Sequence, residues 1–187
     1  MMYNRTTTLN EIRKHLPCTD SWCTLLYKLG KTKADDEPLE YKYILDTLGL
    51  ADAVWALTCT GTPHAVRRFA IKCAEHALYG YLENNELPQD VEVYCVRLID
   101  IAKRYTQNEI SFSKLVAASD KLKLYLYKYE NSEYDNVLRS AISTCWHMED
   151  DDTENANEAA RQASWFARYK DTKVDEYQRG LYVDMFC

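Results

Sequence analysis

Residues 64–82, HAVRRFAIKCAEHALYGYL, decide the fold class of this chain. Their apolar side chains recur at the three- and four-residue spacing of one helix face, and the breaker Gly61-Thr62-Pro63 stands directly before them. This spacing is typical of an amphipathic α-helix whose apolar side lies in a core. The predicted apolar stripe consists of Val66, Phe69, Ala70, Cys73, Ala77 and Tyr81.

Glycine and proline are scarce in the rest of the chain as well: the 187 residues include five glycines and four prolines. Hairpins and βα loops consume glycine, so this scarcity argues against a strand-and-turn architecture. It also argues against nucleotide-binding folds, whose phosphate loops need closely spaced glycines, because every glycine here stands alone. The sequence therefore predicts an all-α protein, a compact bundle of about ten helices without a significant sheet.

Local signals set the expected helix boundaries. Thr8 opens a capping box for a short first helix, and Asp20 is expected to cap a second. Pro38 suits the first turn of a third helix, which Gly49 ends. Further helices are expected at 51–59, 64–82, 91–105, 114–129, 132–147, 153–169 and 174–186.

Residues 121–129, KLKLYLYKY, are ambiguous because they alternate like a β-strand. The same stretch also continues a helical face that starts with Leu115 and runs through Leu122 to Tyr129. No partner strand is visible elsewhere in the sequence. We therefore interpret this segment as helix.

The polar stretch 84–88 is the best candidate for an internal joint. It separates an N-terminal helical region, residues 1–85, from a C-terminal helical bundle, residues 86–187. Nothing in the composition sets the two apart, so we expect them to pack as one unit.

The balance of charge limits the partners that the protein can have. There are 23 basic and 29 acidic residues, for a net charge of −6 at pH 7. A duplex-binding domain usually carries a basic face, so direct nucleic-acid binding is not expected. No apolar stretch reaches the roughly 18 residues of a membrane span, and no membrane association is expected.

Seven cysteines, an odd number, follow an N-terminus that has no apolar signal-peptide core. We therefore expect reduced thiols and a cytoplasmic protein. Cys73 and Cys95 lie in predicted apolar stripes and should react slowly with thiol reagents, whereas Cys187, the final residue, should react quickly.

Two cysteine–histidine pairs are candidates for chemistry. Cys73 and His76 lie three apart on one predicted helix, but a zinc site needs about four ligands and no second pair has suitable spacing. Successive helical residues point about 100° apart, so Cys145 and His147 are poorly placed to share a proton. Glycine loops, HExxH and a nucleophile elbow are also missing from the sequence. We predict no metal, no cofactor and no enzymatic activity.

Residues 149–154, EDDDTE, form the densest charge run in the chain. As a solvated loop, this run would cap the helix that follows and interact favourably with its dipole. As a functional surface, it would dock onto a basic surface of a protein partner. The second interpretation makes its acids candidate partner-binding residues: Glu149, Asp150, Asp151, Asp152 and Glu154.

Fifteen tyrosines are unusual in a chain of this size. Tyr125, Tyr127 and Tyr129 cannot all face one core, so at least one should be exposed or at an interface. Tyrosine offers a large amphipathic contact area at low entropic cost, which suits protein recognition. Tyr127 is therefore a further candidate partner-binding residue.

Short motifs spread over most of the chain carry a family resemblance. They are HLPC (15–18) with Trp22, LGKT (29–32), ADDEPL (34–39), WAL (55–57), RRFA (67–70), CAE (73–75), IAKRY (101–105) and residues 156–167. Together they resemble a family of small helical accessory proteins from bacteriophages and prophages that contain an immunity-protein-like domain. Those domains are very alanine-rich where this chain has leucine and tyrosine at 122–129.

The resemblance implies an all-helical, non-enzymatic protein of the host cell cytoplasm. It implies a phage-encoded protein-binding factor that inhibits a host protein complex, such as a defence system, in the manner of an anti-CRISPR or anti-restriction protein. The alternative is an immunity protein that neutralises a toxin domain. The expected partner is thus a host or toxin protein, and the sequence leaves the oligomeric state open.

Overall fold

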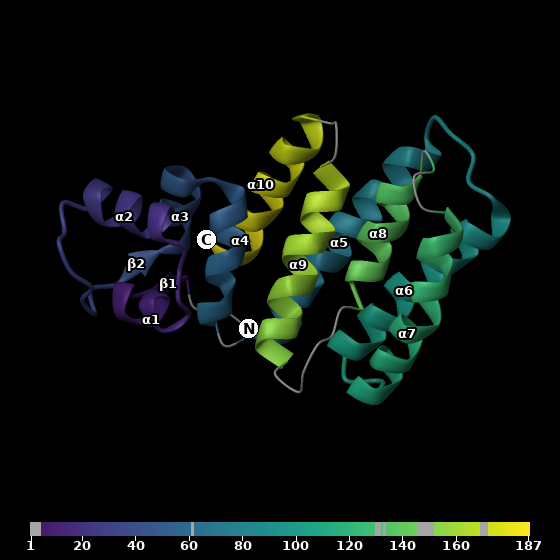
Figure 1. Cartoon of the computed structure of the whole chain (residues 1–187), viewed down its shortest axis with the longest axis horizontal. Helices are drawn as coiled ribbons and strands as arrows, with labels where there is room; N and C mark the ends of the chain where they lie inside the picture. Colours follow the sequence, from purple (N-terminus) through teal and green to yellow (C-terminus); the bar gives the residue numbers. More distant parts are fainter. Residues whose placement is uncertain (1–4, 61, 130–131, 133, 146–151, 169–171) are drawn as a thin grey trace.

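The structure is a computed structural model that describes residues 5–60, 62–129, 132, 134–145, 152–168 and 172–187. At 119–127, 152–154, 168 and 172 it describes the backbone alone. Within these ranges, ten α-helices accompany one 3-10 helix and two very short strands, so the all-α prediction is confirmed (Figure 1). In chain order the elements are β1 (Thr6–Thr7), α1 (Leu9–Lys14), α2 (Thr19–Lys28), β2 (Leu39–Glu40), α3 (Tyr41–Leu48), α4 (Leu50–Ala56), η1 (Leu57–Thr60), α5 (Pro63–Leu82), α6 (Gln89–Thr106), α7 (Phe112–Tyr129), α8 (Asp135–Ser143), α9 (Asp152–Arg168) and α10 (Thr172–Phe186).

The N-terminal cap of α1 is the predicted one, but that of α2 is not. Thr8 Oγ1 accepts a hydrogen bond from the backbone N–H of Glu11 at 3.1 Å. In α2 the N-cap is Cys18, whose Sγ accepts from the backbone N–H of Ser21 at 3.4 Å. The prediction that Asp20 caps α2 was wrong. Asp20 instead lies in the first turn, where a carboxylate is favoured by the helix dipole.

The third predicted helix begins later than expected. Leu39 and Glu40 pair antiparallel with Thr7 and Thr6, so the backbone directly after Pro38 is extended. The prediction that Pro38 occupies a first helical turn was wrong, because this segment bonds to β1 before α3 begins. Gly49 ends α3 as predicted, at a backbone φ of 89° that favours glycine.

The ambiguous stretch 121–129 is helical and forms the second half of α7. The helical spacing of apolar residues from Leu115 onward therefore predicts the structure of this segment better than its strand-like alternation does. Leu115 is fully buried, which places this face of α7 against its neighbours. None of the helices in the described ranges combines the length and apolar character that a membrane span requires.

Buried side chains form two clusters that share α5. The first cluster joins α1 to α4 with α9 and α10, and the second lies among α6, α7 and α8. From α5, the first cluster receives Val66, Phe69, Ala70 and Cys73, and the second receives Ile71, Ala74 and Leu78. The predicted stripe thus corresponds to one of two buried faces of this helix, except for Tyr81, which packs against the second cluster. The division into residues 1–85 and 86–187 stays a prediction, but α9 and α10 pack into the cluster of the N-terminal helices.

Helix α9 packs against α5, α8 and α4, and it occupies the middle of the molecule in Figure 1. Its face toward the core consists of small side chains: Ala156, Ala159, Ala160, Ala163 and Ala167. The first four are fully buried. Because interaxial distance depends on the side chains at the contact, alanine permits close approach of the neighbouring helices.

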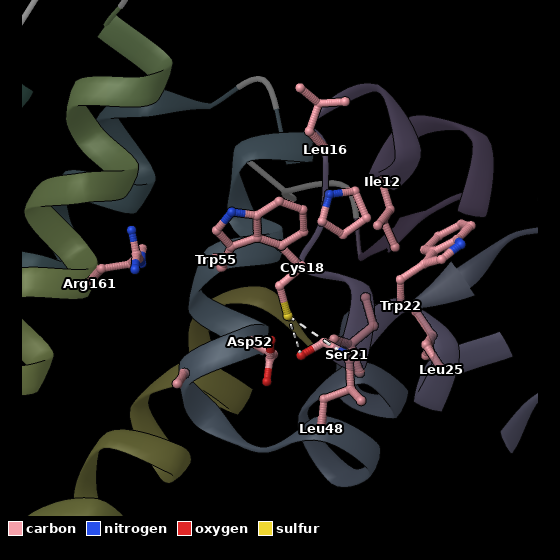
Figure 2. Close-up of a pocket in the computed structure, with 14 residues that line it drawn as sticks. Ile12, Leu16, Cys18, Ser21, Trp22, Leu25, Leu48, Asp52, Trp55 and Arg161 are labelled. Atoms are coloured by element: carbon pink, nitrogen blue, oxygen red, sulfur yellow. Dashed lines mark hydrogen bonds between the residues drawn. The ribbon is translucent and has the colours of Figure 1, made fainter. Parts of the chain in front are cut away.

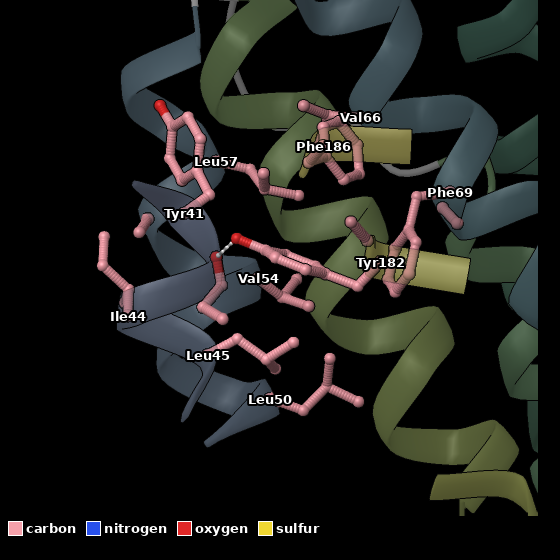
Figure 3. Packing of buried hydrophobic residues seen from close by; sticks show 14 of the residues in the cluster. Tyr41, Ile44, Leu45, Leu50, Val54, Leu57, Val66, Phe69, Tyr182 and Phe186 are labelled. Atoms are coloured by element: carbon pink, nitrogen blue, oxygen red, sulfur yellow. Dashed lines mark hydrogen bonds between the residues drawn. The ribbon is translucent and has the colours of Figure 1, made fainter. Parts of the chain in front are cut away.

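Polar side chains from the C-terminal helices fix α4 in place. Asn157 Nδ2 donates to the backbone oxygens of Val54 and Trp55 at 2.8 and 3.2 Å. Tyr182 Oη donates to the backbone oxygen of Ala53 at 3.0 Å, and its ring packs among the apolar residues in Figure 3. These carbonyls belong to the last turn of α4, so the side chains of Asn157 and Tyr182 tie the end of this short helix to α9 and α10.

The alanine face predicts a strong sensitivity to size. We expect Ala160→Leu to lower the free energy of unfolding by about 1–3 kcal/mol, because a well-packed interior does not accept added methyl groups without strain. Ala117→Leu, on the exposed side of α7, is the matched control and should change it by less than about 0.5 kcal/mol. Urea denaturation followed by circular dichroism measures both. Equal effects would contradict close packing at α9.

Candidate functional site

Three of the six predicted partner-binding residues lie outside the described residues: Glu149, Asp150 and Asp151. Asp152 and Glu154 lie in the first turn of α9, and Tyr127 lies near the end of α7, each with its backbone alone described. The position of Asp152 and Glu154 at a helix N-terminus is one that the dipole favours. The docking role of all six residues stays a prediction.

The two cysteine–histidine pairs are placed as follows. Cys73 is fully buried in the first cluster, and His76 stacks on Tyr177 of α10 with ring centroids 3.9 Å apart. Among the described residues, no three potential ligands of the His, Cys, Asp and Glu types gather as a metal site would require. Cys145 is also buried, which raises the pKa of its thiol to about 11, and its Sγ contacts the backbone oxygen of Leu98 at 3.6 Å. Its predicted neighbour His147 lies outside the described residues.

A different surface, which we name the α4 groove, brings together residues from both ends of the chain. It consists of two adjoining hollows of about 390 and 380 Å³, and Ala51 and Arg161 line both. The first hollow lies between α4 and the connection from α1 to α2. The second lies between α4 and α9. α4 is thus flanked by an open apolar furrow on each side.

The first hollow is walled by aromatic and apolar side chains. Trp55 comes from α4, Trp22 from α2, and Leu16 and Pro17 from the connection between α1 and α2 (Figure 2). Both tryptophans are partly buried, whereas Leu16 is 86% exposed. In the second hollow the principal aromatic side chain is Trp165 of α9, which is 62% exposed.

The backbone of Leu16 is strained. Its φ is +54°, a left-handed conformation that costs a residue with a side chain about 1–2 kcal/mol. The amide N–H groups of His15 and Leu16 bond to the oxygens of Ile12 and Arg13, which closes the end of α1 around this conformation. Glycine is the usual residue at such a helix end. Here the chain instead presents a large apolar side chain to solvent, and strain of this kind is concentrated at functional sites.

Charged groups also line the groove. Arg161 reaches from α9 toward α4 and is half-exposed, and its Nη1 lies 2.7 Å from Glu158 Oε2 (Figure 2). Asp52 lies in the first turn of α4, one turn before Trp55. Within the part of the chain that the structure describes, the Asp52 carboxylate has no hydrogen bond or ion pair.

The arrangement contains side-chain types that suit protein recognition. Trp and Arg are enriched at the energetically dominant positions of protein interfaces. The thiol nearest the groove, Cys18, interacts with Ser21, its Sγ lying 3.0 Å from Ser21 Oγ. Among the described residues of the lining there is no histidine beside this thiol.

Sequence reasoning missed this groove. It assigned no binding role to Leu16, Trp22 or Trp55. The one available signal was the HLPC motif followed by Trp22, which entered only as part of the family resemblance.

Comparison of the chain with protein-family models, with curated proteins and with solved structures finds no match. The resemblance to phage and prophage proteins therefore stays a prediction. The structure alone identifies the chain as a helical protein with a groove lined by aromatic side chains.

The strain at Leu16 leads to a prediction about stability. We expect Leu16→Gly to leave the free energy of unfolding unchanged or to raise it by up to about 1 kcal/mol, because release of the left-handed penalty exceeds the entropy that glycine adds to the unfolded chain. Tyr27→Gly, at an 81% exposed site inside α2, should lower it by about 1 kcal/mol. Urea titrations of both variants measure the difference. A loss for Leu16→Gly as large as that for Tyr27→Gly would show that the Leu16 side chain stabilises the fold.

The thiols should divide into fast and slow groups. Cys18 and Cys23 are exposed and should react first with a disulfide reagent, whereas Cys73, Cys95 and Cys145 are buried. Burial also raises the pKa of Cys95 to about 12. Cys187 is half-buried and burial raises the pKa of its thiol, so we now expect it to react more slowly than Cys18 and Cys23.

Stopped-flow absorbance with the native protein and with the Cys18→Ser/Cys23→Ser variant measures the reactivity of these thiols. The variant should lose the fast phase, and the buried thiols should appear only on unfolding. A fast phase that persists in the variant would contradict this assignment.

Proposed function

We propose that this protein is a non-enzymatic, phage-encoded protein-binding factor that inhibits a host protein complex by occupying one of its surfaces with the α4 groove. A defence complex of the CRISPR or restriction type is the leading candidate target. The observation that carries the proposal is the exposure of Leu16 and Trp165 at the two hollows of a groove that already contains Trp22 and Trp55. The phage origin and the inhibitory role are supported by the motif resemblance alone.

Burial of these side chains by a partner would supply the binding energy. Fully burying one large apolar side chain is worth about 1.5–3 kcal/mol, and Leu16 and Trp165 are both mostly exposed in the free protein. Interfaces concentrate their energy in a few such residues. The strained backbone at Leu16 already holds its side chain outward, so binding need not reorganise it.

The alternative target is a toxin domain, for which the protein would serve as an immunity protein. The net charge of −6 favours this candidate as well, because a toxin that acts on nucleic acid carries a basic face. The physical role of the groove is the same in both cases. Only the identity of the partner separates them.

The proposal is tested by capturing a partner and measuring its affinity for groove variants. The immobilised protein is incubated with host lysate, the captured protein is identified and purified, and binding is then measured by calorimetry. We expect Leu16→Ser and Trp165→Ser each to weaken binding about tenfold or more. Tyr27→Ser, at an exposed aromatic residue outside the groove lining, is the matched control and should bind as the unaltered protein does.

The purified partner should also lose its own activity in proportion to the amount of protein added. Capture of a secreted toxin or of its isolated domain would favour the immunity role. Equal losses in the groove variants and in the Tyr27→Ser control would contradict the groove as the binding surface. Turnover of a substrate by the isolated protein would contradict the non-enzymatic role.

A further inference from the structure

We infer that the α4 groove takes a basic and apolar segment of its partner, with an apolar side chain against Trp55 and a lysine or arginine at Asp52. This inference rests on the proposed function and specifies the chemistry of the partner. It follows from the shape of the first hollow, from the distribution of charge in both hollows and from the position of Trp55 beside Asp52.

The shape of the first hollow favours a narrow segment with an apolar anchor. It is an open space of about 390 Å³, and its lining includes the almost fully buried apolar side chains of Leu25 and Ile44 and the partly buried Leu48. The polar side chains Ser21 and Asp52 also contribute to the lining. A side chain that enters between Leu16 and Trp55 would therefore meet carbon on most sides, which selects an aliphatic or aromatic residue.

The distribution of charge favours a cation in the partner. The described charged residues that line the two hollows are Asp52, Glu158 and Arg161. Glu158 and Arg161 neutralise each other at 2.7 Å. Asp52 is then the unbalanced charge, and the net charge of −6 on the whole chain adds a long-range attraction for a basic segment.

The position of Trp55 reinforces the same preference. Asp52 and Trp55 are three residues apart on α4, so they are neighbours on one helix face, and both line the first hollow (Figure 2). A lysine or arginine side chain held in this hollow would thus have both the Asp52 carboxylate and the Trp55 indole in the surrounding lining. Tryptophan is the best aromatic partner for a lysine or arginine side chain. The carboxylate and the indole therefore act on the same group of the partner.

Two other occupants fit less well. An acidic segment would need Arg161, but Arg161 already pairs with Glu158 on the same helix. A second copy of this chain would bring its own acidic groove against Asp52, because a two-fold contact places the same surface on both sides. Both remain outcomes of the experiment.

The experiment uses a displayed library of short random peptides and the intact protein. Peptides are selected on the unaltered protein and counter-selected on Leu16→Ser, so that only binders of the groove remain. The selected peptides are synthesised and titrated while protein tryptophan fluorescence is recorded. We expect them to share a lysine or arginine near an aliphatic or aromatic residue. Their affinity should also fall as salt is raised.

The matched variants are Asp52→Asn and Asp184→Asn. Asp184 is an exposed acid on α10 outside the groove lining, so its replacement removes the same charge elsewhere. We expect Asp52→Asn to raise the dissociation constant about tenfold and Asp184→Asn to leave it within a factor of two. Equal effects of the two variants would overturn the inference, since they would show general attraction to an acidic protein. Selection of acidic or uncharged peptides, or of none, would overturn it as well.

Analytical ultracentrifugation of the protein without peptide tests whether a second copy occupies the groove. A dimer that disappears in Leu16→Ser would show that the occupant is a second copy and would overturn the inference. A captured partner that requires Leu16 and Trp165 but is insensitive to Asp52→Asn would overturn the basic chemistry and leave the proposed function intact. Basic peptides bound at Asp52 without any partner from lysate would support the chemistry and contradict the proposed function.

Discussion

The contact on which the rest of the structure depends is the alanine face of α9 against α5 and α8. Because alanine side chains are short, α9, which lies near the C-terminus, can pack closely among helices from the first half of the sequence and α8. On α8, Ser140 Oγ donates to the backbone oxygen of Ala163 at 2.9 Å, which fixes α9 along its length. Because α9 also meets α4, the two ends of the sequence close around the first cluster. This closure forms the second hollow of the α4 groove and brings Arg161 to the edge of the first.

Contacts between α9 and α4 also support the residues that line the groove. Asn157 of α9 donates to the carbonyls of Val54 and Trp55, so it binds the very turn that carries the Trp55 side chain. Both carbonyls also accept from the backbone N–H of Leu57, and that of Trp55 accepts from Thr58 Oγ1 at 2.9 Å. Asn157 therefore adds a long-range contact that ties this turn of α4 to α9. Its amide is buried, where loss of a partner is most costly.

The sequence predicted those parts of the structure that depend on local periodicity and capping. Most of the apolar stripe of residues 64–82 and the N-cap at Thr8 are found, because each depends on neighbours within one or two turns, although the Glu11 carboxylate pairs with Lys14 rather than completing a capping box. The second buried face of α5 was missed. It includes Arg67, which a periodicity argument assigns to solvent, yet Arg67 is fully buried, donates to the backbone oxygen of Thr144 at 2.9 Å and lies over the Tyr105 ring. These partners are far along the chain, so no local pattern could indicate them.

The groove was unpredictable for the same reason, and its composition shows why. Trp55 and Arg161 are brought together by tertiary packing, and the left-handed backbone of Leu16 depends on how α1 ends. Along α9, successive side chains turn by about 100°, so Ala160 faces the core while Arg161 lines the groove, and Ala163 faces the core while Trp165 lies outside. One face of α9 thus requires small side chains for close packing, whereas the side chains of the other face can vary. The core contact and the groove lining are separated by one or two residues along the same helix, so substitutions around Arg161 and Trp165 can change the groove without changing the alanine contact.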